Sequence, residues 1–294
     1  MLSGRSRAVP VHLLLVLAQV CFASLPIAGK FAMRGSIGPA SIVLARVAGG
    51  AVVFAVIAWQ RGTLYIHRRD VPAILGCALL GVAANQELFV QGLARSTATN
   101  ASVLGATVPV FTAVVAISLR HEPLCMRRLV GISIAFGGVA ALVGAHQMSL
   151  SSDRLVGNVM VLLNSLFYAT SLVVVRPLAR RYDPIALLAW LFIAAVPMVA
   201  PFGLVELAHA PPLQLADLEL IAFLIAVPTV AAYGLVQIAL PYTEASRLAA
   251  YIYLQPVITT LAAMVLLHEH PGPRSIVCGP IVLAGVWLAA KRAR

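Results

Sequence analysis

The sequence contains few charged residues, and this scarcity sets the class of protein. Asp, Glu, Lys and Arg make up 11% of the 294 residues, whereas soluble proteins carry about 25%. Hydrophobic residues account for 61% of the chain, and no polar stretch is long enough to form a soluble domain. Because a soluble fold could not cover this many apolar side chains with a polar surface, the composition predicts a polytopic membrane protein.

Motifs for catalysis and for metal binding are also absent. The sequence has no Walker loop, no HExxH and no G-x-S-x-G, and its 4 cysteines are scattered without a CxxC. The segment His268-Glu269-His270 could suggest a metal, but the related pair His121-Glu122 lacks the second histidine. We therefore expect no catalytic residue, metal or cofactor, and we interpret Glu122 and Glu269 each as a carboxylate that caps or charges the N-terminus of the next helix.

Long apolar runs, in contrast, fill the chain. A helix needs about 20 mostly apolar residues to cross a membrane. Ten runs are close to this length, so the predicted fold class is an all-α polytopic membrane protein with ten transmembrane helices. The expected spans are 11–33, 39–59, 72–94, 97–119, 129–147, 156–178, 184–205, 218–240, 244–267 and 275–291.

The second half of the chain repeats the first. Residues 95–143 align without a gap on 242–290 when they are shifted by 147 positions, which places Pro109 on Pro256. Residues 22–30 recur at 168–176, so the first span belongs to the fold and is not expected to be a cleaved signal sequence. The repeat predicts two five-helix domains, 8–147 and 155–292, of the kind that forms transporters around a central site.

The basic residues are distributed unevenly along the chain. Most of the 21 Lys and Arg residues fall on one side of the membrane when the N-terminus is assigned to the cytoplasm, and the opposite loop at 206–217 has none. This positive-inside asymmetry predicts an inner (cell) membrane protein with both termini cytoplasmic. It explains the net charge of +11 by contact with anionic lipids and not by binding of nucleic acid. Since five spans per half is an odd number, the two repeats are inverted.

Two segments carry a resemblance to a known family. Residues 244–257, EASRLAAYIYLQPV, followed by 266–269, LLHE, closely resemble the EamA domain of the drug/metabolite transporter superfamily. The first-half segments 97–110, TATNASVLGATVPV, and 119–122, LRHE, are similar to the same pattern. The family's first helix has a Trp eight residues before a basic residue, and here Phe22 and Tyr168 replace that Trp. The resemblance implies two inverted five-helix halves and export of small metabolites or drugs.

Three ionisable residues stand out by their depth inside predicted spans, where a charge costs about 2.5–3.5 kcal/mol. Glu87, Arg46 and Lys30 fall at comparable heights in the outer half of the membrane. A pair between Glu87 and either cation is therefore geometrically plausible. Glu87 is the strongest candidate for the pathway of substrate or protons, whereas Lys30 could instead extend to the outer head groups and Arg46 could serve a structural ion pair.

Uncharged polar residues complete the candidate pathway. Gln91 lies one helical turn after Glu87, and Tyr233 and Gln237 repeat this spacing in the second half. We expect Gln91 and Gln237 to face one another across the pathway. The other candidates are Gln19 in the first span and Asn164 and Tyr168 in the sixth. Each could instead form a hydrogen bond between helices.

Prolines at matched positions predict helix bends. Pro109 and Pro256 remove backbone hydrogen bonds within the fourth and ninth spans. Matched interruptions in two halves indicate the region of a binding site. Residues 129–143 contain a single polar residue, Ser133, and 276–290 contain no charged residue. We therefore expect a cavity walled by spans one to four and six to nine, with the fifth and tenth spans in a supporting role.

These observations favour a secondary active transporter that exports a small organic metabolite, such as an amino-acid-like compound or a drug, by alternating access. Its expected partners are the small-molecule substrate, membrane lipids and protons, with proton antiport through Glu87 as the favoured coupling. Three alternatives remain, one of them a purely structural membrane protein, which Arg46 and Glu87 inside the spans disfavour. A flippase for a small amphiphile would need a lateral opening, and an intramembrane enzyme would need a nucleophile or metal cluster. The sequence is compatible with a monomer or a homodimer.

Overall fold

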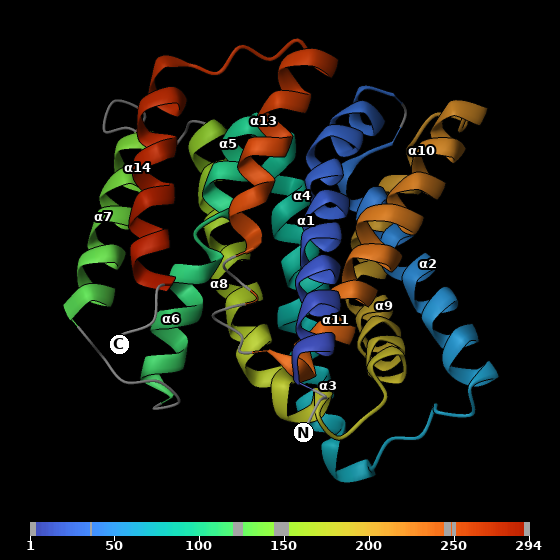
Figure 1. Ribbon diagram of the computed structural model, residues 1–294. Coiled ribbons are helices and arrows are strands. Elements are labelled where there is room, and N and C mark those ends of the chain that lie inside the picture. Colours follow the sequence, from blue (N-terminus) through green and yellow to red (C-terminus); the bar gives the residue numbers. More distant parts are fainter. Residues whose placement is uncertain are drawn as a thin grey trace.

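The computed structural model describes residues 4–35, 37–119, 126–143, 153–243, 248 and 251–290, and these residues form a bundle of helices without strands (Figure 1). An all-α polytopic membrane architecture is thus confirmed. The number of ten spans stays a prediction, because the spans expected at 129–147 and 244–267 extend beyond the described residues. Within these described ranges, seven segments are long and apolar enough to cross a membrane: Val11–Arg34, Pro39–Gln60, Arg68–Arg95, Ala98–Ser118, Asp153–Ala179, Pro184–Ala208 and Leu215–Tyr242.

The first half of the chain begins with two long helices and continues with interrupted ones. Its elements are α1 (Gly4–Arg34), α2 (Pro39–Gln60), the short 3₁₀ turn η1 (Arg68–Asp70), α3 (Val71–Ala78), the π turn η2 (Leu79–Ala83), α4 (Ala84–Arg95), α5 (Ala98–Gly105), α6 (Val108–Ser118) and α7 (Met126–Val143).

The second half follows the same plan. Its elements are α8 (Asp153–Ala179), α9 (Pro184–Ala208), α10 (Leu215–Ile225), the π turn η4 (Ala226–Ala231), α11 (Ala232–Ala239), the 3₁₀ turns η5 (Leu240–Tyr242) and η6 (Tyr251–Tyr253), α13 (Leu254–Leu266) and α14 (Pro273–Ala290). The two π turns begin 147 residues apart, which is the spacing of the sequence repeat.

Packing between the halves mirrors the duplication. Helix α2 packs against its counterpart α9, and α7 packs against its counterpart α14. Helix α4 contacts α8, and the equivalent contact in the other half joins α11 to α1. Figure 1 shows α7 and α14 side by side at one edge of the bundle, away from α2 and α10. The first and second halves therefore interlock through matched helices.

The two halves run in opposite directions. Asp70, at the start of the third predicted span, accepts a hydrogen bond from Tyr182, just after the end of α8. On the other face, Asp217 at the start of α10 lies against Gly35, just after the end of α1. These two contacts are related by the same shift of 147 residues, and they join opposite ends of α1 and α8. We call the face at which α1 ends the predicted outer face and the other the predicted inner face.

Short polar contacts start several helices. Asp183 accepts hydrogen bonds from the backbone of Ile185 and Ala186 at the N-terminus of α9. Thr97 caps α5 through the backbone N–H of Asn100. Such caps satisfy donors that have no partner within the helix. In α2 this partner comes from a distant residue, because the N–H of Ser41 donates to Glu206 on α9 at 2.6 Å.

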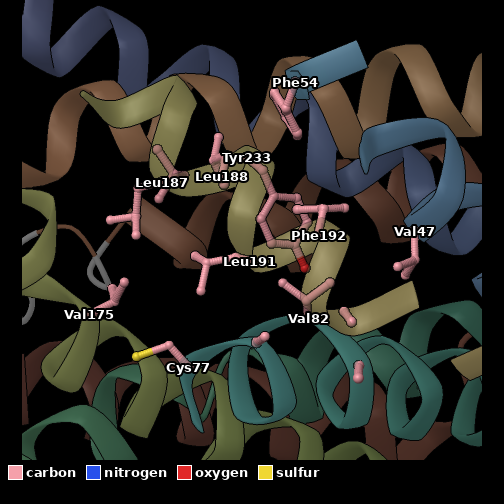
Figure 2. Packing of buried hydrophobic residues seen from close by; sticks show 14 of the residues in the cluster. Val47, Phe54, Cys77, Val82, Val175, Leu187, Leu188, Leu191, Phe192 and Tyr233 are labelled. Atoms are coloured by element: carbon pink, nitrogen blue, oxygen red, sulfur yellow. The ribbon is translucent and has the colours of Figure 1, made fainter. Parts of the chain in front are cut away.

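The buried core holds a row of aromatic rings that crosses the bundle. Phe54 on α2 meets Phe192 on α9, and Phe192 meets Tyr233 on α11, with ring centroids 5.3 Å apart at each contact. Phe22 on α1 continues the row against Tyr233 at the same distance. Edge-to-face contacts of this kind stabilise a core beyond the area that they bury. Figure 2 shows Tyr233 beside Phe192, with Val82 and Cys77 from the segment α3–η2 below them.

Candidate functional site

A central cavity lies at the end of the aromatic row, between the two halves. Its volume is about 80 Å³. It is lined by residues from α1, α2, α4, α8 and α11, from the break between α5 and α6, and from the segment η6–α13. This volume holds several water molecules but is below the range of about 300–1,000 Å³ typical of drug-sized ligands. Its apolar walls are Phe22, Leu25, Phe89, Gly105, Val108 and Ile252, and its polar walls are Arg46, Asn85, Gln86, Asn164, Tyr168, Tyr233 and Gln255.

Hydrogen bonds fix one wall of this cavity. The side-chain amide of Asn164 donates to the carbonyl oxygen of Asn85 at 2.8 Å, and the amide of Asn85 points back to the carbonyl of Asn164 at 3.5 Å. The hydroxyl of Tyr233 donates to the side-chain oxygen of Asn85 at 3.2 Å. Helices α4, α8 and α11 are therefore joined at the cavity, with two from one half and one from the other.

A second set of contacts joins α1 to α13 beside the cavity. The amide of Gln255 donates to the side-chain oxygen of Gln19 at 2.6 Å, and the hydroxyl of Thr259 donates to the carbonyl of Ala23 at 3.1 Å. Gln19 is itself buried and does not line the cavity. It acts on the cavity wall by holding Gln255.

Arg46 reaches the cavity from α2. Its side chain is 1% exposed, and its Nε donates to the hydroxyl of Thr229 at 2.9 Å. The Thr229 hydroxyl in turn donates to the carbonyl of Leu224. The two terminal nitrogens of Arg46 have no hydrogen-bond partner in the part of the chain that the structure describes. Thr229 thus holds one nitrogen of the guanidinium in place, and the other two nitrogens keep N–H donors for a further partner.

Of the predicted pathway residues, four line this cavity and the others lie elsewhere. Arg46, Asn164, Tyr168 and Tyr233 belong to its wall. Their function stays a prediction, but their meeting at one place is a structural observation. Sequence reasoning missed Asn85, Gln86 and Gln255, although the first two directly precede Glu87 and the third directly precedes Pro256.

The sequence made an ion pair of Glu87 with Arg46 or Lys30 plausible, and the described residues do not form it. The Oε1 of Glu87 instead accepts a hydrogen bond from Gln91 at 2.9 Å. Its Oε2 is buried and has no hydrogen-bond partner among the described residues. The cause is helix geometry: Gln86 lines the cavity, and the next residue along a helix points about 100° away from it. Glu87 therefore lies behind the wall that Arg46 faces.

The expectation that Gln91 and Gln237 face one another is also wrong. Gln91 accepts a hydrogen bond from Arg95 near the predicted outer face, whereas Gln237 lines a separate hollow of about 30 Å³ with Cys77 and Gly81. Because the halves are inverted, matched positions lie at opposite heights. Asn85 and Tyr233 are in contact, Gln91 lies six residues after Asn85, and Gln237 lies four residues after Tyr233. Because α4 and α11 run in opposite directions, these ten residues separate the two glutamines by roughly 15 Å along the bundle.

The matched prolines lie at helix interruptions. Pro109 is in the first turn of α6, directly after the break that separates α5 from α6. Pro256 is in the first turn of α13, directly after the 3₁₀ turn η6. A proline is tolerated at the start of a helix because its missing N–H needs no partner there. Gly105, Val108, Ile252 and Gln255 line the cavity from these two interruptions.

Lys30 lies in a different place, at the predicted outer face. It lines an open hollow of about 420 Å³ together with Arg34, Thr97 and Glu269. Glu269 accepts hydrogen bonds from the backbone N–H groups of Ala98 and Thr99 at 3.0 and 3.2 Å, and also from the Thr99 hydroxyl. The expectation that Glu269 caps the next helix, α14, is therefore wrong. It caps α5 in the other half, a contact that local sequence rules cannot detect. Glu122 lies outside the described residues.

Replacing Glu269 with alanine is expected to destabilise the contact between the halves. It leaves two backbone N–H groups of α5 without their acceptor, which costs about 1–3 kcal/mol of unfolding free energy. The loss should appear as a lower melting temperature in detergent, with Glu269→Gln intermediate because one acceptor oxygen remains. His270→Ala is the matched control on an exposed neighbour. A melting temperature of Glu269→Ala equal to that of the control would contradict the capping role.

A polar cluster joins the halves on the predicted inner face. Asp70 accepts a hydrogen bond from the Tyr182 hydroxyl and forms an ion pair with Arg181 at 3.4 Å. The backbone N–H of His67 donates to the same hydroxyl at 3.2 Å. Burial, followed by the bond to Asp70, raises the pKa of Tyr182 above its ordinary value. The hydroxyl therefore stays protonated and able to donate at neutral pH.

Comparisons with known proteins agree with this architecture. The chain is 26% identical over 284 residues to an uncharacterized transporter of Archaeoglobus fulgidus, covering 96% of this chain and 97% of that protein. It is 28% identical over 281 residues to a probable terminal-alkyne amino-acid exporter of Streptantibioticus cattleyicolor, covering 95% and 92%. A solved structure described as "Crystal structure of protein" shares the fold, with a TM-score of 0.70 at 17% identity over 97% of this chain and 98% of that one.

The family assignment rests on both halves. Residues 9–144 and 155–291 each match the EamA-like transporter family. Two related domains, an all-helical membrane fold and transporter-named relatives of full length agree with one another. The chain is therefore a member of the EamA-like transporter family.

Proposed function

We propose that this chain is a secondary active transporter that exports a small amino-acid-like metabolite across the cytoplasmic membrane by alternating access. The central cavity carries the proposal. It lies between two oppositely directed halves, most of its wall area is apolar, and polar side chains from both halves converge in it. Small-molecule sites have this composition, and transporters with inverted repeats bind their substrates at such a position.

The substrate class is drawn from the cavity and from one relative. The relative from Streptantibioticus cattleyicolor is named as a probable amino-acid exporter. The cavity combines amide and guanidinium groups with the rings of Phe22 and Phe89. Polar groups of this kind suit the charged end of an amino acid, and the rings suit a short apolar side chain. The small volume favours a compact molecule over a drug-sized one.

Glu87 is the proposed site of proton coupling. It is an acidic residue inside a predicted span, with one oxygen bonded to Gln91 and the other without a partner. A carboxyl group in this setting can take up a proton and release it in another conformation. Because it lies behind the cavity wall, it would act on the substrate site through the neighbouring Gln86 and not by direct contact.

Two measurements test the proposed function. The first compares the metabolites inside and outside cells that overexpress the protein with those of cells that lack it, and export predicts a compound that moves from the cells to the medium. The second measures counterflow of labelled L-norvaline in proteoliposomes. Movement of a fluorescent lipid between leaflets without any solute transport would favour a flippase, and formation of a new product would favour an enzyme.

The orientation of the chain gives a further prediction. Because basic residues concentrate on one side, we expect both termini in the cytoplasm. A phosphatase fused after residue 210 should be active in the periplasm, and a fluorescent protein fused after residue 294 should fluoresce in the cytoplasm. A fusion after residue 62, in the loop after α2, is the matched control for the inner side. A periplasmic C-terminus would overturn both the orientation and the direction of export.

A further inference from the structure

The Arg46 guanidinium is a buried charge without a counter-ion. Its side chain is 1% exposed, and no described residue forms a hydrogen bond with Nη1 or Nη2. Within the described part of the chain no carboxylate forms an ion pair with Arg46. The ion pair found there joins Asp70 to Arg181. Arginine keeps its proton in proteins, and an unpaired buried charge is costly. An anion from outside the protein would satisfy it.

The same cavity wall offers a second set of free polar atoms. Gln86 is 2% exposed, and among the described residues no group lies within standard hydrogen-bond geometry of its amide nitrogen or oxygen. Gln86 and Arg46 line one cavity from α4 and α2. Together they present several N–H donors and one acceptor oxygen to the cavity. Buried polar atoms are almost always satisfied in proteins, by water or by a ligand, so these atoms are available to a polar molecule that enters the cavity.

We propose that Arg46 binds the carboxylate of the transported molecule, assisted by the amide of Gln86. The proposal rests on the transport function proposed above and specifies its substrate class as small aliphatic carboxylates, including amino acids. A guanidinium binds a carboxylate through two parallel hydrogen bonds, and Nη1 and Nη2 are the two free donors. One positive charge matches one carboxylate, whereas a phosphate would leave charge uncompensated. The aliphatic part lies against Phe22, Phe89 and Ile252.

Three probes test which end of the ligand matters. L-norvaline carries both an ammonium and a carboxylate, pentanoate carries the carboxylate alone, and L-norvalinamide lacks it. At equal ionic strength, we expect norvaline and pentanoate at saturation to raise the melting temperature of the full-length protein in nanodiscs by roughly 5 °C. Norvalinamide should give no rise. An equal rise with norvalinamide, no rise with either carboxylate, or an equal rise with chloride would each overturn the proposal.

Variants of Arg46 separate binding from a structural role. Arg46→Gln should lose the response to both carboxylates, while its melting temperature without ligand stays equal to or above that of the native protein, because an unpaired buried charge has been removed. Arg46→Lys keeps the charge but loses the paired geometry, and it should bind pentanoate about tenfold more weakly. Arg34→Gln, at the outer end of α1, is the matched control and should respond like the native protein. A stable Arg46→Gln variant that keeps the full response would contradict the proposal.

Transport distinguishes the failure of this proposal from failure of the function on which it rests. If native protein moves norvaline by counterflow and Arg46→Gln moves it at the same rate, the carboxylate site is wrong and the transporter function stands. If native protein shows the carboxylate-dependent rise in melting temperature but exports no solute in cells, the binding site stands and the export function is wrong.

Discussion

Replacing Gly92 with alanine is expected to destabilise the protein strongly, because the added methyl group meets the backbone of a neighbouring helix. Helices α4 and α8 cross at Gly92 and Gly157, with no room between their backbones. A Cβ on Gly92 would lie 2.7 Å from the carbonyl oxygen of Gly157, and a Cβ on Gly157 would lie 2.8 Å from that of Gly92. Small residues permit this close approach of membrane helices. Since both obstructions are backbone atoms, the helices themselves must separate.

The expected cost of Gly92→Ala is about 3 kcal/mol of unfolding free energy, and Gly92→Val should prevent the accumulation of folded protein. The crossing lies near the mutual hydrogen bonds of Asn85 and Asn164 on the same two helices, so separation would also disturb the cavity wall. Fluorescence-detected size exclusion and thermal melting measure both effects. Gly76→Ala is the control, because nothing lies within 4 Å of its added Cβ. A melting temperature for Gly92→Ala equal to that of Gly76→Ala would show that the crossing is not close.

Glu87→Gln is expected to abolish proton-driven transport while the protein folds normally. Glutamine keeps the shape of the side chain and can still bond to Gln91, but it cannot bind and release a proton. For a carrier that exchanges one proton for one substrate molecule, a difference of one pH unit supports about a tenfold concentration ratio. The variant should lose this ratio in proteoliposomes and retain exchange of labelled for unlabelled substrate.

The neighbouring carboxylate of Glu206 provides the control for Glu87. It binds the backbone N–H of Ser41 at the start of α2, so Glu206→Gln should change stability and leave the response to pH in place. Substrate accumulation by Glu87→Gln that still follows the pH gradient would assign the coupling to another group. A parallel loss of counterflow in Glu87→Gln would instead indicate a role in substrate binding.

Much of the fold could be predicted from the sequence, because composition and repetition act over the whole chain. The apolar runs indicated the membrane, and the duplication predicted two related halves, which the structure joins through matched helices, α2 with α9 and α7 with α14. Polar residues at membrane depth pointed to Arg46, Asn164, Tyr168 and Tyr233, which the structure brings to one cavity. A polar side chain that faces lipid is costly on any side of a helix. Such residues are therefore expected in the protein interior whatever the fold.

The predictions were wrong where they depended on the direction in which a side chain points and not on the depth of its residue in the membrane. A regular helical period could not show whether Gln86 or Glu87 faces the cavity, because the π turn η2 precedes them and shifts the period. Matched residues were expected at equal height, although inversion places Gln91 and Gln237 toward opposite faces. Glu269 caps a helix 171 residues earlier in the chain, and a capping rule based on neighbouring residues cannot find such a partner.

The π turns also determine which side chain occupies each place on the cavity wall. A π turn holds one more residue than an α turn. If η2 became an α turn, every following residue of α4 would move forward by one helical position. Gln86 would then take the place of Glu87, and Asn85 would take the place of Gln86 in the cavity that Arg46 lines. The same step at η4 would put Ala232 in the place of the Tyr233 ring. A shift of one helical residue, without any rigid movement of the halves, would thus shorten the polar side chain beside Arg46 and remove a ring from the cavity wall.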